Sequence, residues 1–81
     1  MALKDEIFQT IQTAAAQTFN IPADQVTLKT NFNGDLKAKS VNFVQIIGEI
    51  EDEFGVEVNF MNFRRNATVG DAVNFVEDLL S

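Results

Sequence analysis

The apolar residues of this chain recur at three- and four-residue spacing in three separate segments, and no other feature of the sequence constrains the fold as strongly. Such spacing places the apolar side chains on one face of an α-helix. The first segment runs from Leu3 to Phe19 and should end before Pro22, because the residue preceding a proline is disfavoured in helical geometry. Its stripe consists of Leu3, Ile7, Ile11, Ala14 and Ala15.

The second helix is predicted to begin at Ser40 and to end at Gly55, since glycine is common where a helix terminates in a left-handed conformation. Gly48 lies inside this helix, where glycine costs about 1 kcal/mol relative to alanine. Either another helix packs closely against Gly48 or the position is suboptimal, and we favour close packing. The main apolar stripe is expected to contain Val41, Val44, Ile47 and Phe54, widened by Phe43 and Ile50.

The last periodic segment follows Thr68, which precedes Asp71 by three residues and resembles a capping box with aspartate in the place of glutamate. Before it, residues 56–58 alternate like a strand but are too few, and residues 60–65 predict a short third helix. The stripe of the final helix consists of Val69, Ala72, Val73, Val76, Leu79 and Leu80.

The connection over residues 20–39 is too apolar for a loose linker, and we expect it to pack onto the helices. A β-hairpin over residues 25–32 is the competing interpretation, which we set aside because no second run of strand formers lies within hairpin distance. The sequence therefore predicts an all-α fold, a small four-helix bundle of three main helices and a short one, in a single domain spanning 1–81. The apolar residues of the connection are Val26, Leu28, Phe32 and Leu36.

Composition removes several classes of function. The chain has no cysteine and no histidine, which removes the commonest nucleophile activators and metal ligands, so we expect no catalytic site and no metal site. A formal charge of -6 disfavours nucleic acid and anionic membranes and favours basic protein surfaces, although solubility alone would explain it equally well. Residues 1–8 lack a long apolar run, so a cytoplasmic protein without a membrane span is expected, and a monomer is the default.

Ser40 allows two interpretations. A serine at the start of a helix most often caps a free backbone amide and does nothing more. Since no histidine or cysteine can activate its hydroxyl, any reaction at Ser40 would need a base supplied by another protein. A hydroxyl that depends on another protein for its activation suits a modified residue better than a catalytic one.

Residues 32–41, Phe-Asn-Gly-Asp-Leu-Lys-Ala-Lys-Ser-Val, resemble the acyl carrier protein signature Phe-x-x-Asp-Leu-Gly-Ala-Asp-Ser-Leu. Residues 26–28 are similar to the loop of that family, residues 51–58 to the acidic end of its second helix, and residues 68–73 to the start of its last helix. The resemblance implies that Ser40 accepts 4'-phosphopantetheine from coenzyme A through a Mg-dependent phosphopantetheinyl transferase, or holo synthase. The arm would then carry acyl thioesters to fatty-acid or related biosynthetic enzymes. The residues flanking the modified serine would be Asp35, Leu36, Ala38 and Val41.

The resemblance also implies partners with basic surfaces, namely the transferase, acyltransferases, synthases or acyl ligases. The family's partners are expected to read the acidic face of the second helix, but here that face is altered. Lys37 and Lys39 replace Gly and Asp of the signature, Val41 replaces Leu, and Asn42 and Gln45 fill positions that are usually acidic. We therefore expect a specialised carrier. Its docking residues are predicted to be Glu49, Glu51, Asp52, Glu53 and Lys39.

Two alternatives remain open at this point. One is a peptidyl or aminoacyl carrier of a polyketide or nonribosomal pathway, which would share the bundle and the serine. The other is an unmodified helical adaptor that uses Ser40 only as a cap. The core could also part to admit an acyl chain, although ordinary packing is the favoured role of its small and branched residues, Ala14, Val44, Ile47, Ala72 and Val73.

Overall fold

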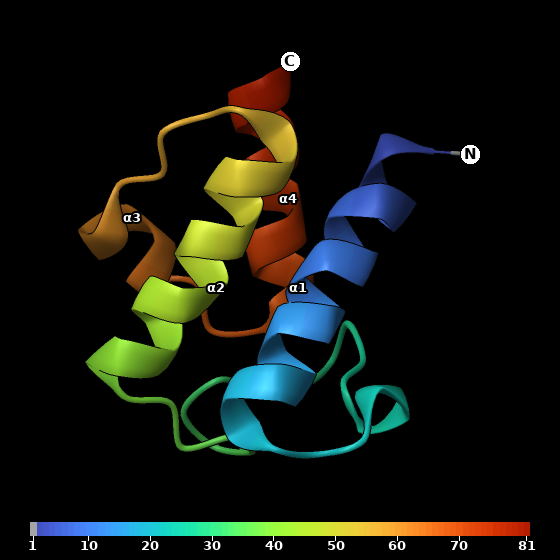
Figure 1. Ribbon diagram of the computed structural model, residues 1–81, viewed down its shortest axis with the longest axis vertical. Helices are drawn as coiled ribbons and strands as arrows, with labels where there is room; N and C mark the ends of the chain where they lie inside the picture. The colour runs from blue at the N-terminus through green and yellow to red at the C-terminus, as the bar shows by residue number, and fades with distance from the viewer. Residues whose placement is uncertain (1) are drawn as a thin grey trace.

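The computed structural model describes residues 2–81, which form four α-helices and one turn of 3-10 helix (Figure 1). Helix α1 packs against both α2 and α4, and the short α3 lies beside α2. The predicted all-α bundle with a long connection between the first two main helices is confirmed. The elements are α1 (Leu3–Phe19), η1 (Ala23–Gln25), α2 (Ser40–Phe54), α3 (Phe60–Arg64) and α4 (Val69–Leu80).

The helix ends lie where the sequence places them. Asn20 and Gly55 end α1 and α2 in the left-handed conformation, with φ of 56° and 65°. The Thr68 hydroxyl accepts a hydrogen bond from the Asp71 amide at 3.1 Å and so caps α4. Each end is thus fixed by a local interaction or a residue type that the chain itself supplies.

The buried face of α2 differs from the predicted stripe. Val41 and Val44 are 59% and 56% exposed, so their assignment to the core was wrong. The register of α2 is set by Phe43, whose ring lies 5.4 Å from that of Phe32 in the preceding connection. This contact turns the next apolar residues of the same face inward. The buried residues of α2 are Phe43, Ile46, Ile47 and Ile50.

Phe32 is the centre of an aromatic cluster that joins the long connection to the helices. Its side chain is fully buried, and its ring also lies 6.1 Å from that of Phe63 in α3. The prediction that the connection packs onto the bundle is confirmed for Phe32 and Val26, and Leu36 is half-buried against the core. It is wrong for Leu28, which is 52% exposed.

The long connection also completes the N-terminus of α4. The amides of Val69 and Gly70 each donate to a carbonyl of the connection at 2.9 Å, those of Thr30 and Leu28. Both are among the first amides of α4, which have no acceptor inside the helix. No hairpin forms in residues 2–81, whose one β-type pairing is an isolated bridge between Asn31 and Thr68.

Two glycines differ in the space around them. A Cβ on Gly70 would lie 3.0 Å from the Leu28 carbonyl oxygen, a tight contact that would force the connection to shift away from α4. A Cβ on Gly48 would meet nothing within 4 Å, so the predicted close packing against Gly48 was wrong.

None of the helices in residues 2–81 has the length and apolar character needed to cross a membrane.

Candidate functional site

Ser40 is the first residue of α2, and its side chain is exposed. The N-cap is Lys39, whose side chain has no acceptor atom, and the side-chain oxygen of Asn42 takes over the capping role by accepting from the Lys39 amide at 2.9 Å. No hydrogen bond within residues 2–81 involves the Ser40 hydroxyl. The interpretation of Ser40 as a residue that only caps its helix is therefore contradicted.

Asn42 also fixes where the start of α2 lies. Its Nδ2 donates to the hydroxyl of Thr18 near the end of α1, with 3.0 Å between the two atoms. One half-buried side chain thus caps α2 and ties it to α1. The sequence analysis treated Asn42 only as a lost acidic residue, and the capping-box spacing from Lys39 to Asn42 was the signal that could have revealed its role.

The segment before Ser40 is held by Asn31 and Asp35. The carboxylate of Asp35 accepts from the Asn31 amide at 2.8 Å, and the Asn31 side-chain oxygen accepts from the amides of Asn33 and Gly34 at 2.9 and 2.7 Å. Asp35 therefore shapes the turn that leads into α2. This is a structural role for the aspartate that the signature places five residues before the serine.

Leu36 and Ala38 anchor the same segment to the bundle. Both are half-buried against the core, and the Ala38 amide donates to the Phe32 carbonyl at 2.8 Å. Between them Lys37 takes a positive φ of 51°, a conformation that glycine adopts without strain and that the signature fills with glycine. The alternation of anchored and exposed residues leaves Lys37, Lys39 and Ser40 exposed.

The N-terminus of α2 suits a phosphate ester. The backbone amides of Ser40 and Val41 have no acceptor among residues 2–81, and Lys37 and Lys39 add two exposed cationic side chains immediately before them. Free amides at a helix start and nearby ammonium groups both favour an attached anion. The residues present therefore fit a phosphodiester at the Ser40 hydroxyl.

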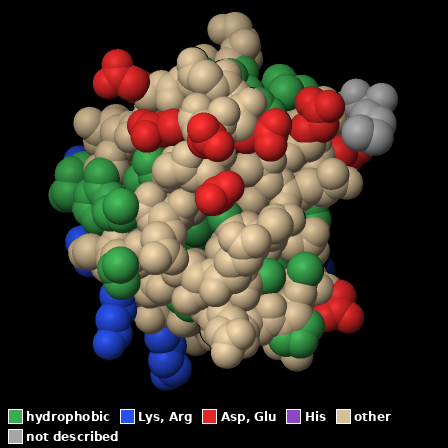
Figure 2. Space-filling view, in the orientation of Figure 1, with side chains coloured by type: hydrophobic (Ala, Val, Ile, Leu, Met, Phe, Trp, Pro, Cys, Tyr) green, Lys and Arg blue, Asp and Glu red, His purple; other side chains and the backbone are tan. Residues whose placement is uncertain are grey.

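The predicted docking acids lie at the opposite end of α2. Glu49, Asp52 and Glu53 are exposed, and nine residues separate Ser40 from Glu49, or about 13 Å along the helix axis. On the face shown in Figure 2, basic side chains protrude at the lower edge, where α2 begins, and a row of acidic side chains crosses the upper half, where α2 ends. Glu51 is half-buried and accepts from the Val58 amide at 2.8 Å, so it also holds the turn after α2.

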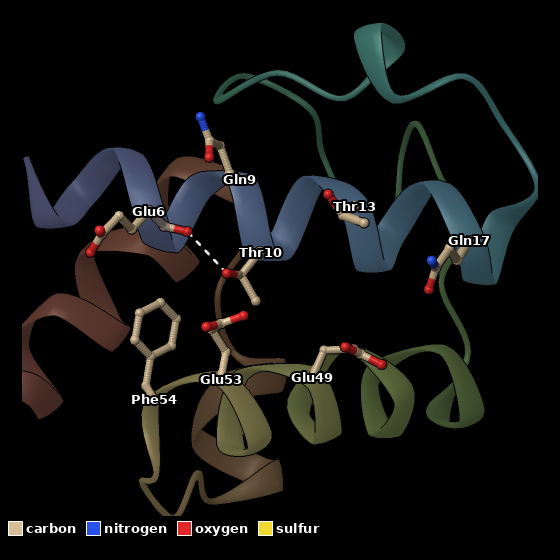
Figure 3. Close-up of a pocket in the computed structure, with 8 residues that line it drawn as sticks. All are labelled: Glu6, Gln9, Thr10, Thr13, Gln17, Glu49, Glu53 and Phe54. Carbon is tan, nitrogen blue, oxygen red and sulfur yellow. Dashed lines mark hydrogen bonds between the residues drawn. The ribbon is translucent and has the colours of Figure 1, made fainter. Parts of the chain in front are cut away.

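A groove between α1 and α2 is lined mostly by polar side chains, including Glu6, Thr10, Gln17, Glu49 and Glu53 (Figure 3). Ser40 does not line it. Phe54, at one end, is the one hydrophobic residue among those that line the groove. No group of three or more acidic side chains in the described part of the chain is arranged to hold a metal ion.

The family model described as the phosphopantetheine attachment site matches residues 9–76, which include all of α2 and its flanking segments. The match and the helical bundle define a carrier domain of the phosphopantetheine-bearing class.

Curated relatives are similar to the chain over most of its length. An acyl carrier protein from Lactobacillus acidophilus is 39% identical over 91% of this chain and 92% of its own. One from Helicobacter pylori is 38% identical over 89% and 92%, and one from Thermotoga maritima is 32% identical over 99% of both chains. The chain belongs to the acyl carrier protein family. It is a carrier of acyl groups on phosphopantetheine, in the manner of a family that serves fatty-acid biosynthesis, and it is not an enzyme.

Proposed function

We propose that Ser40 is the residue that bears 4'-phosphopantetheine. The observation that carries this proposal is the exposed Ser40 hydroxyl, which makes no hydrogen bond within residues 2–81, while Asn42 caps the start of the helix. The attached group supplies a terminal thiol, which a chain without cysteine does not have itself. Asp35, Leu36 and Ala38 act as positioning residues that hold the serine at the start of α2.

The test is the intact mass of the protein after incubation with coenzyme A, Mg²⁺ and a broad-specificity phosphopantetheinyl transferase. We expect a mass increase of one phosphopantetheine group, absent from the Ser40→Ala variant. The chain offers a matched control, since its other serine is Ser81, whose hydroxyl donates to the Glu77 carbonyl at 2.8 Å. Ser81→Ala should be loaded like the wild type; an adduct that persists in Ser40→Ala would contradict the proposal.

The proposal includes the surface that partner enzymes contact. Exposed acids at the end of α2, Glu49, Asp52 and Glu53, would attract basic patches on transferases, acyltransferases and synthases. Lys39 adds a positive charge beside the serine, so partners selected for acidic residues at that place should bind this chain less well. A specialised set of partner enzymes is the consequence we propose, for a monomeric carrier working in the cytoplasm.

A further inference from the structure

Asn33 is the one asparagine of the chain that precedes a glycine. Both Asn33 and Gly34 are exposed, in the turn that leads toward α2. The Asn33 side chain makes no hydrogen bond within residues 2–81. Because glycine has no Cβ, its amide nitrogen can approach the side chain of the preceding residue without steric hindrance. The side-chain amide of Asn33 is therefore open to attack by the backbone of its own chain.

The other asparagines lack this combination. Each precedes a residue that has a side chain, and in most cases that residue is phenylalanine. Asn31 precedes Phe32, which is fully buried and whose amide donates to the Ala67 carbonyl at 3.0 Å. Asn74 is exposed, as Asn33 is, but it lies within α4 and precedes Phe75. Asn74 is thus a natural reference for an accessible asparagine in an unfavourable setting.

One contact opposes the attack on Asn33. The Gly34 amide donates to the side-chain oxygen of Asn31 at 2.7 Å. An amide nitrogen has to lose its proton before it can act as a nucleophile, and a hydrogen bond through that proton stabilises the protonated form. Asn31 is itself half-buried, and its backbone amide donates to the Asp35 carboxylate at 2.8 Å. The folded turn therefore slows a reaction that the local sequence favours.

We propose that Asn33 is a site of spontaneous deamidation and that the side chain of Asn31 limits its rate in the folded chain. The Gly34 nitrogen loses its proton to hydroxide and attacks the side-chain carbonyl carbon of Asn33. The bond from that carbon to Nδ2 breaks, and the nitrogen takes up a proton from water and leaves as ammonia. Water then opens the resulting succinimide at one of its two carbonyls, which gives aspartate or isoaspartate.

Deamidation would change the turn before Ser40 in two ways. Either product adds one negative charge to a chain whose formal charge is -6. Isoaspartate also adds a methylene group to the backbone just before Gly34. The Asn31 carbonyl accepts from the amides of Asp35 and Leu36 at 2.9 and 3.1 Å, and these bonds span the lengthened segment. We therefore expect the isoaspartyl product to have a lower melting temperature than the original chain.

The experiment incubates the unmodified protein at physiological temperature, at neutral and at mildly alkaline pH. Mass spectrometry of proteolytic peptides locates each conversion of an amide to an acid. We expect Asn33 to convert before Asn74 and faster at the higher pH. In Gly34→Ala, whose Cβ would lie 3.4 Å from the Asn31 side-chain oxygen in ordinary contact, the rate at residue 33 should fall toward that of Asn74. Conversion of Asn33 no faster than that of Asn74 in the wild type would overturn the proposal.

Variants of Asn31 test its part in limiting the rate. Asn31→Ala removes the acceptor of the Gly34 amide, so Asn33 should convert about twofold to tenfold faster. Asn31→Asp keeps an acceptor oxygen and should not accelerate the reaction, and circular dichroism checks that both variants are folded. Equal acceleration in both, or none in Asn31→Ala, would refute the role of Asn31. Hydrogen exchange in the wild type tests the same bond without a substitution, because an unprotected Gly34 amide would also refute that role.

Discussion

The Asn42 side chain donates a hydrogen bond to the hydroxyl of Thr18, with 3.0 Å between Nδ2 and Oγ1, and so joins the start of α2 to the end of α1. The same side chain accepts from the Lys39 amide through Oδ1. An acidic residue at position 42 could accept from both groups but could donate to neither. The asparagine therefore removes a negative charge next to Ser40 while keeping the cap.

Replacing Asn42 by alanine should destabilise the fold. Loss of the cap and of the bond to Thr18 together should lower the free energy of unfolding by about 1–3 kcal/mol. Asn42→Asp should lose less, because its carboxylate still accepts from the Lys39 amide and can accept from the Thr18 hydroxyl. Urea unfolding followed by circular dichroism measures both values, and equal losses in the two variants would show that the cap is unimportant.

The two glycines at positions 48 and 70 should respond in opposite directions to alanine. Gly70→Ala brings a Cβ to 3.0 Å from the Leu28 carbonyl oxygen, and relief of this crowding should cost about 1–3 kcal/mol of stability. Gly48→Ala, in open space, should instead stabilise the fold by about 0.5–1 kcal/mol. Thermal unfolding of the two variants side by side measures the difference, and a shift of the same sign in both would refute this account.

The cap of α4 should contribute measurably to stability. Thr68→Ala removes the hydroxyl that accepts from the Asp71 amide, which should cost about 0.5–2 kcal/mol. Thr13→Ala is the matched control, since Thr13 is exposed inside α1 and its hydroxyl makes no hydrogen bond in the described part of the chain. Chemical unfolding of both variants tests this. Equal stabilities would mean that the pairing of α4 with the long connection suffices without the threonine.

The charge at position 39 should control the rate of loading. Lys39→Asp restores the acidic residue of the family signature, so transferases that read an acidic helix start should load the variant up to about tenfold faster at low salt. The advantage should shrink as ionic strength rises, because salt screens exposed charges. Lys29→Asp makes the same charge change in the exposed part of the long connection and serves as the control. Equal acceleration by both substitutions would point to net charge, not to docking beside Ser40.

Helix positions followed from the sequence, because residues such as Pro22, Gly55 and Thr68 act within a few residues of their own place in the chain. The face of α2 that is buried could not be predicted from the sequence. The spacing fits a stripe through Val41 and Val44 as well as one through Phe43 and Ile46, and the choice depends on the contact of Phe43 with Phe32, eleven residues earlier. Periodicity within one helix carries no information on such a tertiary contact.

In the candidate site, too, features set by nearby residues could be predicted from the sequence and features set by tertiary contacts could not. Ser40 was predicted as the modified residue from a local motif, and its motif neighbours Asp35, Leu36 and Ala38 have local structural reasons for their types. The capping by Asn42 and its bond to Thr18 were missed, since the partner of that bond lies 24 residues away. The open space beside Gly48, where a Cβ would meet no atom of residues 2–81 within 4 Å, was likewise a property of the folded molecule.

The unfilled amides at the start of α2 link modification to folding. A negative charge attached at Ser40 would interact favourably with the amides of Ser40 and Val41 only while α2 is folded. The modified chain would therefore have a larger free energy of unfolding than the unmodified chain, by the free energy of that interaction. For a group at a helix N-terminus this difference is about 0.3–1 kcal/mol. The attached arm would thus stabilise the helix that carries it, as a bound ligand stabilises a folded protein. Helix α2 would unfold less readily in the loaded carrier than in the unloaded one.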